Sequence, residues 1–284
     1  MSTVARLAAF VVLLLAVFGA AALAGGATDP GAGATSRPAT TSAEHGDDGG
    51  QGVPKAASSP GALPGLAVAQ DGFRLELSGP APERSSRQPL RFRILDSAGR
   101  PVRSFEEAHE KRMHLIVVRR DLRRFQHLHP TMAPDGTWSI DADLARAGTY
   151  RVFADFTIAG AQRTLGADLQ VPGAFEAGVL PPVSDVARTP TGLDVQLRRS
   201  GESIAFDVLR DGRVVNDELE DYLGAKGHLV TLRAADLAYL HSHPDGDRLA
   251  FAVAFPSAGA YRLWVQFQLD GVVHTAAFTQ EVPA

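Results

Sequence analysis

Two stretches of this 284-residue chain repeat one pattern: MHLIVVRRDLRRFQHLHP at residues 113–130 and GHLVTLRAADLAYLHSHP at residues 227–244. Each stretch holds a histidine, twelve intervening residues and then His-x-His-Pro. The first copy contains His114, His127 and His129, and the second contains His228, His241 and His243. The copies are 114 residues apart at every histidine, so six of the nine histidines belong to one pattern written twice.

The sequence around both stretches consists of short runs that alternate apolar and polar residues and end at Gly, Pro or Asp. Such runs are typical of β-strands. Examples are LRFRIL (90–95) and TYRVFADFTI (149–158) in the first half, and IAFDVL (204–209) and AYRLWVQFQL (260–269) in the second. About seven such strands in each half, without a convincing amphipathic helix, predict an immunoglobulin-like sandwich.

The two halves align along their whole length. Phe92 matches Phe206 at the histidines' offset, and after the hairpin the offset becomes 111, which matches Tyr150 with Tyr261. Self-similarity of this kind indicates a tandem duplication. We therefore predict an all-β fold with two tandem immunoglobulin-like β-sandwich domains, at residues 66–172 and 183–284.

An N-terminal apolar segment and a linker come before these domains. Residues 1–24 contain an apolar stretch, LAAFVVLLLAVFGAAALA, that ends in Ala-Leu-Ala before Gly25, as a cleaved signal peptide does. Its length also suits a membrane anchor. Residues 25–65 are rich in Gly, Ala, Ser, Thr and Pro, so we predict a disordered linker. The protein is then exported, either secreted or anchored in the cell envelope by residues 7–24.

Composition excludes several classes of site and partner. The chain has no cysteine, which excludes disulfides, thiolate zinc sites, Fe–S clusters and blue-copper centres. Its net charge of −4 comes without a long basic run, so we expect no nucleic-acid partner. No Gly-x-Ser-x-Gly, phosphate loop, dinucleotide fingerprint or HExxH occurs. We therefore predict that the protein is not an enzyme.

The repeated histidines have the spacing of a metal site. Residues two apart on a strand share a face, so His127 and His129 point the same way, as do His241 and His243. In an antiparallel hairpin with an even-numbered loop, His114 joins the first pair, and an odd loop places it on the other side. Three imidazoles without thiolate suit Cu(II) or Zn(II). Candidates for a further ligand are His109 and Glu106 in the first copy, and His274 and Glu220 in the second.

The residues HEKRMHLIVVRRDLRRFQHLHP, followed by DGTW and GTYRVFADF, resemble a family of exported β-sandwich domains found in proteins associated with heavy-metal and copper handling. The resemblance covers residues 105–157 well and 219–268 less well. It implies a binding role for His109, His114, His127 and His129. The second copy has Leu223 and Gly227 where the first has His109 and Met113, so it departs from a four-histidine pattern.

Three functional hypotheses follow. The preferred one is an exported accessory protein with one Cu(II) or Zn(II) site per repeat, for buffering, delivery or sensing, whose partner is an envelope metal transporter or chaperone. The second is an adhesion or scaffold module whose histidines are structural. The third is a zinc hydrolase, for which Glu106 and Glu220 are the only repeated candidates for a general base.

Overall fold

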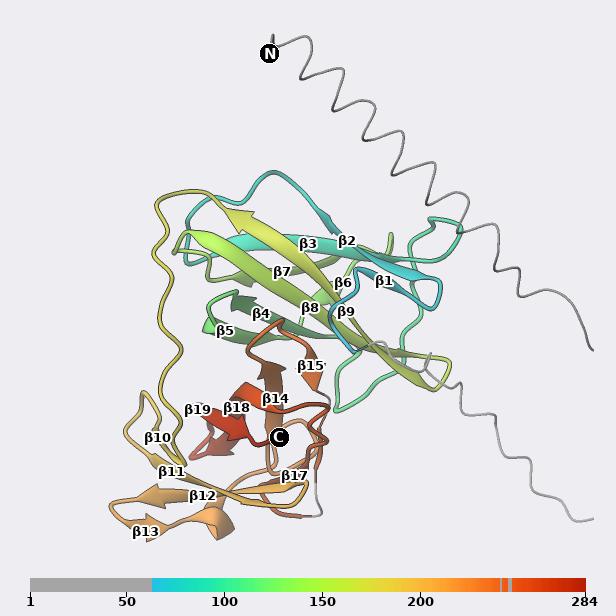
Figure 1. Ribbon diagram of the computed structural model, residues 1–284. Coiled ribbons are helices and arrows are strands. Elements are labelled where there is room, and N and C mark those ends of the chain that lie inside the picture. Colours follow the sequence, from blue (N-terminus) through green and yellow to red (C-terminus); the bar gives the residue numbers. More distant parts are fainter. Residues whose placement is uncertain (1–62, 241, 245–246) are drawn as a thin grey trace, which may run out of the picture. The chain divides into compact units, whose positions relative to one another are not determined.

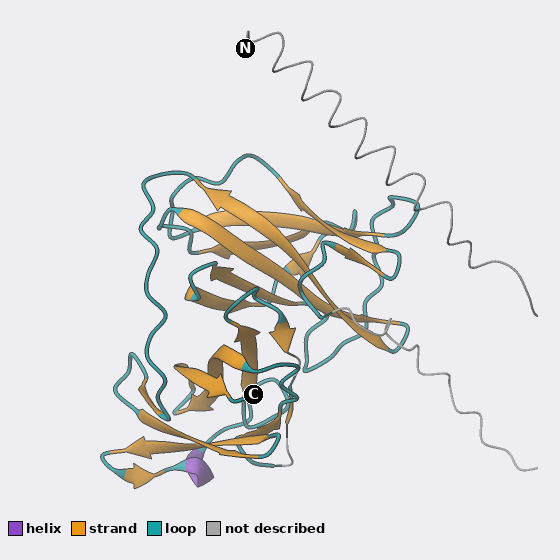
Figure 2. Cartoon of the chain, viewed as in Figure 1, coloured by secondary structure: helices purple, strands orange, loops and turns teal. Residues whose placement is uncertain are grey.

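The computed structural model describes residues 63–240, 242–244 and 247–284, and nearly all of its regular elements are β-strands (Figure 1, Figure 2). The chain divides into two units, Met1–Gly52 and Val53–Ala284, and every described residue belongs to the second. Among these residues no helix has the length and apolar character needed to cross a membrane. The predicted signal peptide or anchor and most of the predicted linker lie outside the described residues.

The first repeat folds into two antiparallel sheets (Figure 1). One has the order β1-β2-β3-β7-β6 and is formed by β1 (Ala69–Gln70), β2 (Phe73–Ser78), β3 (Gln88–Leu95), β7 (Trp138–Ala142) and β6 (Thr131–Met132). The other has the order β5-β4-β8-β9 and is formed by β5 (Arg123–Leu128), β4 (His114–Arg119), β8 (Gly148–Ile158) and β9 (Ala161–Val171). Alternate residues of both sheets point inward, and Phe92, Trp138 and Tyr150 are at most 1% exposed in the core between them.

The second repeat has the same plan. One sheet has the order β10-β11-β12-β17-β16, with β13 also paired to β12, and is formed by β10 (Val186–Arg188), β11 (Asp194–Ser200), β12 (Ser203–Arg210), β17 (Ala250–Ala252), β16 (His243–Pro244) and β13 (Arg213–Val214). The other has the order β15-β14-β18-β19 and is formed by β15 (Tyr239–Leu240), β14 (His228–Arg233), β18 (Gly259–Leu269) and β19 (Val272–Val282). A single 3₁₀ turn, η1 (Asn216–Glu218), follows β13.

Local detail confirms that the two sandwiches are copies of one fold. The hydroxyl of Tyr150 donates to the carbonyl of Arg146 at 2.9 Å, and the hydroxyl of Tyr261 donates to that of Ser257 at 2.8 Å. Both tyrosines begin the long strand of their repeat and are fully buried. The chain is thus two tandem immunoglobulin-like β-sandwiches, as the alternating pattern predicts.

A third core joins the two four-stranded sheets on their outer faces. Strand β4, HLIVVR, is apolar at consecutive positions, and β14, HLVTLR, is interrupted only by the buried Thr231, so both strands can be buried on both faces. One face of each strand lies in its own sandwich. The other faces meet in a cluster that contains Ile116, Val118, Leu122 and Phe153 of the first repeat, and Val230, Leu232, Leu237, Tyr239 and Trp264 of the second.

Two aromatic pairs show that this shared core is nearly symmetric. Phe125 stacks on Trp264 with ring centroids 4.6 Å apart, and Tyr239 lies 5.7 Å from Phe153. Phe125 and Tyr239 are equivalent residues of the two hairpins, and Phe153 and Trp264 are equivalent residues of β8 and β18. Each hairpin therefore contacts the long strand of the other repeat, which is the arrangement of an isologous interface.

The last residues of the predicted linker are part of this junction. The amide of Gly65 donates to the carbonyl of Thr164, and the amide of Tyr239 donates to the carbonyl of Pro64, both at 2.9 Å. Gly65 has a φ of +77°, and a Cβ there would lie 2.7 Å from the ring of Phe153. Only glycine fits this position without a shift of its neighbours. Residues 63–65 are thus ordered against both repeats.

Candidate metal centre

The first histidine hairpin has an odd loop, and it still places all three histidines on one face. Arg119 pairs with Arg123, which leaves an odd loop of three residues. An odd loop alone would place His114 on the opposite face from His127. However, β5 has one extra residue opposite Val118, a β-bulge, and the bulge restores the parity. Ile116 then pairs with His127, so the face of His114 and Ile116 is also the face of His127.

The three first-copy histidines form one cluster. One ring nitrogen from each of His114, His127 and His129 lies within 4.8 Å of the others. The shortest separation is 3.0 Å, between Nδ1 of His114 and Nε2 of His127. Nitrogens bound to one ion at about 2.0 to 2.1 Å are about 2.8 to 4.2 Å apart, so slight side-chain rotation would bring all three onto one metal.

The hydrogen bonds of these rings determine which nitrogens carry protons. Nε2 of His114 lies 3.0 Å from the carbonyl oxygen of Ala108, so it must donate its N–H. Nδ1 of His127 lies 2.6 Å from Oε1 of Gln266, whose Nε2 in turn donates to Oγ1 of Thr275. Each ring has then used its N–H outside the cluster. The two facing nitrogens, Nδ1 of His114 and Nε2 of His127, therefore carry no proton, and each presents a lone pair to the other.

Two lone pairs 3.0 Å apart repel each other unless a cation lies between them. A proton is disfavoured in that position, because burial lowers the pKa of His114 and lowers that of His127 well below its ordinary value. Burial also lowers the pKa of His129 to about 4, and Nε2 of His129 is buried without a hydrogen-bond partner among the described residues. At neutral pH the cluster therefore presents neutral imidazoles, the form that binds a metal ion.

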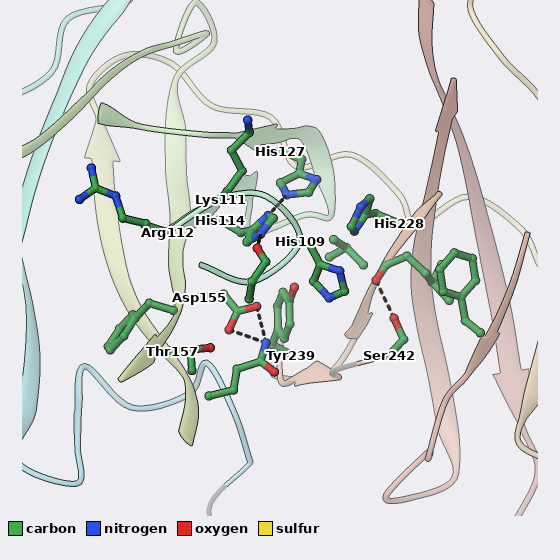
Figure 3. Close-up of a pocket in the computed structure, with 16 residues that line it drawn as sticks. His109, Lys111, Arg112, His114, His127, Asp155, Thr157, His228, Tyr239 and Ser242 are labelled. Carbon is green, nitrogen blue, oxygen red and sulfur yellow. Dashed lines mark hydrogen bonds between the residues drawn. The ribbon is translucent and has the colours of Figure 1, made fainter. Parts of the chain in front are cut away.

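A histidine of the second repeat lies beside this cluster (Figure 3). The ring of His228 is centred 6.1 Å from that of His127 and 6.2 Å from that of His114. Its Nε2 donates to the carbonyl of Tyr222 at 3.0 Å, the position equivalent to Ala108, so its Nδ1 is also unprotonated. Burial lowers the pKa of His228 to about 4. His228 is thus a candidate fourth ligand from the other repeat.

His109 lies beside His228 and belongs to a tight turn. His109 and Glu110 both have positive φ values, and Ala108 and Lys111 exchange backbone hydrogen bonds around them. This two-residue turn aims the carbonyl of Ala108 at His114. The ring of His109 lies edge-on to that of His228, with centroids 5.1 Å apart. The structure therefore brings together five of the predicted ligands: His109, His114, His127, His129 and His228.

Two polar residues of the site escaped the sequence prediction. Asp155 pairs with His114 across β4 and β8, and Gln266 pairs with His228 across β14 and β18. They are equivalent positions of the two repeats. Asp155 is buried, accepts hydrogen bonds from Gln162 and Thr164, and has its pKa raised to about 6 by burial. The available signal was a polar residue inside an apolar run, in VFADF and LWVQF.

The cavity beside the imidazoles is small. It has a volume of about 40 Å³ and is lined by residues of both repeats, among them His109, His114, His127, Asp155 and His228. This is room for an ion with one or two waters, and too little for an organic substrate. His129 also lines an open hollow, in which the carboxylates of Glu107 and Glu110 are balanced by the cations of Lys111 and Arg112.

Three predicted residues lie elsewhere because they have other partners. The carboxylate of Glu106 accepts from the amide of Gly160 at 2.9 Å, and that of Glu220 accepts from the amide of Gly271 at 2.8 Å. Both glutamates thus hold the turn between the last two strands of their repeat. His274 lies 2.7 Å from the hydroxyl of Thr191. The hydrolase hypothesis therefore loses both of its repeated general bases.

The second copy of the pattern is divided between two sheets. His228 begins β14, whereas His243 lies in β16, where it pairs with Ala252 of the opposite sheet. His241 lies outside the described residues. A separate second site, built from His228, His241 and His243, stays a prediction.

Comparisons with known proteins give a family. A family described as "Domain of unknown function (DUF8832)" matches residues 67–173 and 191–284. No curated protein matches the chain. Solved structures with some likeness include a two fibronectin type III domain segment from chicken tenascin, with 13% identity, a TM-score of 0.22, and coverage of 74% of this chain and 97% of that one.

A titin segment has 14% identity, a TM-score of 0.21, and coverage of 75% of this chain and 98% of that one. The extracellular domains 3–5 of Drosophila OTK have 13% identity, a TM-score of 0.20, and coverage of 76% of this chain and 67% of that one. At these TM-scores the neighbours carry no argument about fold or function.

Proposed function

Since the chain belongs to the DUF8832 family, whose name assigns no activity, we propose a function from the site itself: a non-enzymatic, exported protein that binds one Cu(II) or Zn(II) ion at the junction of its two sandwiches. His114, His127 and His129 are its ligands, and His228 is the candidate fourth. The role is buffering, delivery or sensing of the metal, with an envelope transporter or chaperone as partner.

One observation carries this proposal. Nδ1 of His114 and Nε2 of His127 face each other at 3.0 Å after both rings have used their N–H groups elsewhere. A metal-bound histidine typically donates the N–H of its second ring nitrogen to a carbonyl or amide oxygen, which orients the ring. The carbonyl of Ala108 and the amide oxygen of Gln266 have that role here. A purely structural pair of histidines would place one N–H between the two rings.

The test is titration of the purified full chain with Cu(II) and with Zn(II), followed by calorimetry and by metal analysis after dialysis. The triple variant His114→Ala, His127→Ala, His129→Ala is compared with His274→Ala, which removes a histidine outside the cluster. We expect one site of micromolar or tighter affinity in the wild type and in His274→Ala, and none in the triple variant. Equal loss of binding in both variants, or no binding in the wild type, would refute the proposal.

The rival function is an adhesion or scaffold module, and the immunoglobulin-like fold favours it. The same imidazoles adjoin the apolar junction that contains Ile116 and Val230, so they also have a packing role. In that case the triple variant lowers the melting temperature, and added metal leaves the melting temperature of the wild type unchanged. A metal-dependent rise in the wild-type melting temperature separates the two functions.

A further inference from the structure

A second and larger hollow at the junction shares His127 with the histidine cavity. Its volume is about 650 Å³. Its floor is the outer face of β18 and β19, where register places Arg262 opposite Thr279, Trp264 opposite Ala277, and Gln266 opposite Thr275. Its walls are residues 124–127 of β5 and parts of the segment 181–190 that leads into the second repeat. We name this hollow the junction groove.

The charged residues that line the junction groove are all positive. Arg124, Arg188 and Arg262 line it, and no aspartate or glutamate does. Within the described part of the chain, neither Arg124 nor Arg262 forms an ion pair with a carboxylate. Arg188 has one exposed and loose partner, Asp194, at 3.6 Å. A concave surface of one sign concentrates its field and attracts ligands of the opposite sign.

Arg262 is the central group of the junction groove. It is half-buried, with its guanidinium 5.9 Å from the ring centroid of Trp264, and its Nη1 donates to Oγ1 of Thr279 at 2.9 Å. Its Nε is buried and has no hydrogen-bond partner among the described residues. A partly desolvated guanidinium with an unused N–H and no counter-ion is costly. A carboxylate bound against it would supply both the charge and the acceptor.

We propose that the junction groove binds a small organic anion with two or more carboxylate groups. Arginine is suited to carboxylates because its planar fork donates two parallel hydrogen bonds. The hydroxyl groups of Thr275 and Thr279 supply further polar contacts on the floor, because each accepts a hydrogen bond from a neighbouring side chain and can still donate its O–H. The volume lies within the range of about 300 to 1,000 Å³ that is usual for small-molecule sites. This inference does not depend on the metal site.

Citrate is the probe for this site, titrated calorimetrically into the metal-free full chain at low ionic strength. The variants are Arg262→Gln and Arg124→Gln, and the matched control is Arg74→Gln, which removes an exposed arginine paired with Glu76 on β2. We expect Arg262→Gln to weaken citrate binding about ten-fold or more, because a charge-assisted bond to a half-buried group is lost. Arg124→Gln should weaken it about three-fold, and Arg74→Gln should leave it unchanged.

Arg124 is exposed, so its variant keeps the test decisive if Arg262→Gln fails to fold. Sulfate, a dianion without a carbon frame, should bind at least ten-fold more weakly than citrate, and equal binding would overturn the assignment to a polycarboxylate. The inference also fails if citrate does not bind at millimolar concentration, or if its affinity is the same in all variants. An acidic peptide that binds where citrate does not would show a docking site for protein instead.

Discussion

Nδ1 of His127 lies 2.6 Å from Oε1 of Gln266, so a histidine of the first repeat is oriented by an amide of the second. The two residues are 139 positions apart in the chain. The candidate metal centre therefore belongs to the pair of repeats, although its three clustered ligands come from one hairpin.

Gln266→Leu should weaken metal binding while leaving every ligand in place. Without the orienting acceptor, the ring of His127 can rotate and its proton can move to the other ring nitrogen. Such losses typically reduce the affinity for the metal about 10- to 100-fold. Competition titration with a chromogenic chelator measures the change. Gln196→Leu, at an exposed position of β11, is the control and should retain wild-type affinity. Equal affinity in Gln266→Leu would show that the contact does not orient a ligand.

Asp155→Asn should stabilise the metal-free protein at neutral pH and leave it unchanged in acid. Burial raises the pKa of Asp155 from 3.8 to about 6, so the folded state keeps its proton longer than the unfolded state does. Stability is then lost as pH rises from about 4 to about 6, by up to roughly 3 kcal/mol. Asparagine removes this loss. Urea unfolding at pH 4 and pH 8 measures it, and an equal effect at both values contradicts the assignment.

His228→Asn should make the metal-free protein less sensitive to acid. Burial lowers the pKa of His228 from 6.5 to about 4, so below pH 6.5 the unfolded state binds a proton that the folded state refuses. Stability therefore falls as pH decreases from 6.5 towards 4. The variant should show a shallower fall across that window in thermal melts. Gln196→Leu, at an exposed position of β11, serves as the control and should keep the wild-type slope.

Phe153→Ala should destabilise the protein by about 3 to 5 kcal/mol, because it empties a fully buried site in the core between the repeats. The two sandwiches should then unfold in separate calorimetric transitions. Phe92→Ala, in the core of the first sandwich alone, should lower stability without separating the transitions. A loss below about 1 kcal/mol for Phe153→Ala would mean that the shared core is not formed in solution.

The sequence predicted the strands, the duplication and the face shared by His127 and His129, because these depend on local periodicity, and it left the face of His114 to the parity of the loop. It missed how parity is restored. The bulge opposite Val118 depends on how Leu122 and Arg124 adopt positive φ, which no apolar pattern encodes. The contribution of the second repeat was also out of reach, since Gln266 meets His127 only after two outer faces have packed. The apolar runs of β4 and β14 indicated such a face but not its partner.

The position of Pro64 and Gly65 gives the N-terminal residues a mechanical link to the junction. A pulling force on residues before Pro64 acts first on the backbone bonds of Gly65 to Thr164 and of Tyr239 to Pro64. These bonds lie where the two repeats meet, a contact that we call the seam. The force therefore reaches the seam before it reaches the core of either sandwich. Tension would therefore loosen the contact between the repeats. In single-molecule pulling from the N-terminus, we expect rupture of the seam to come before unfolding of either sandwich.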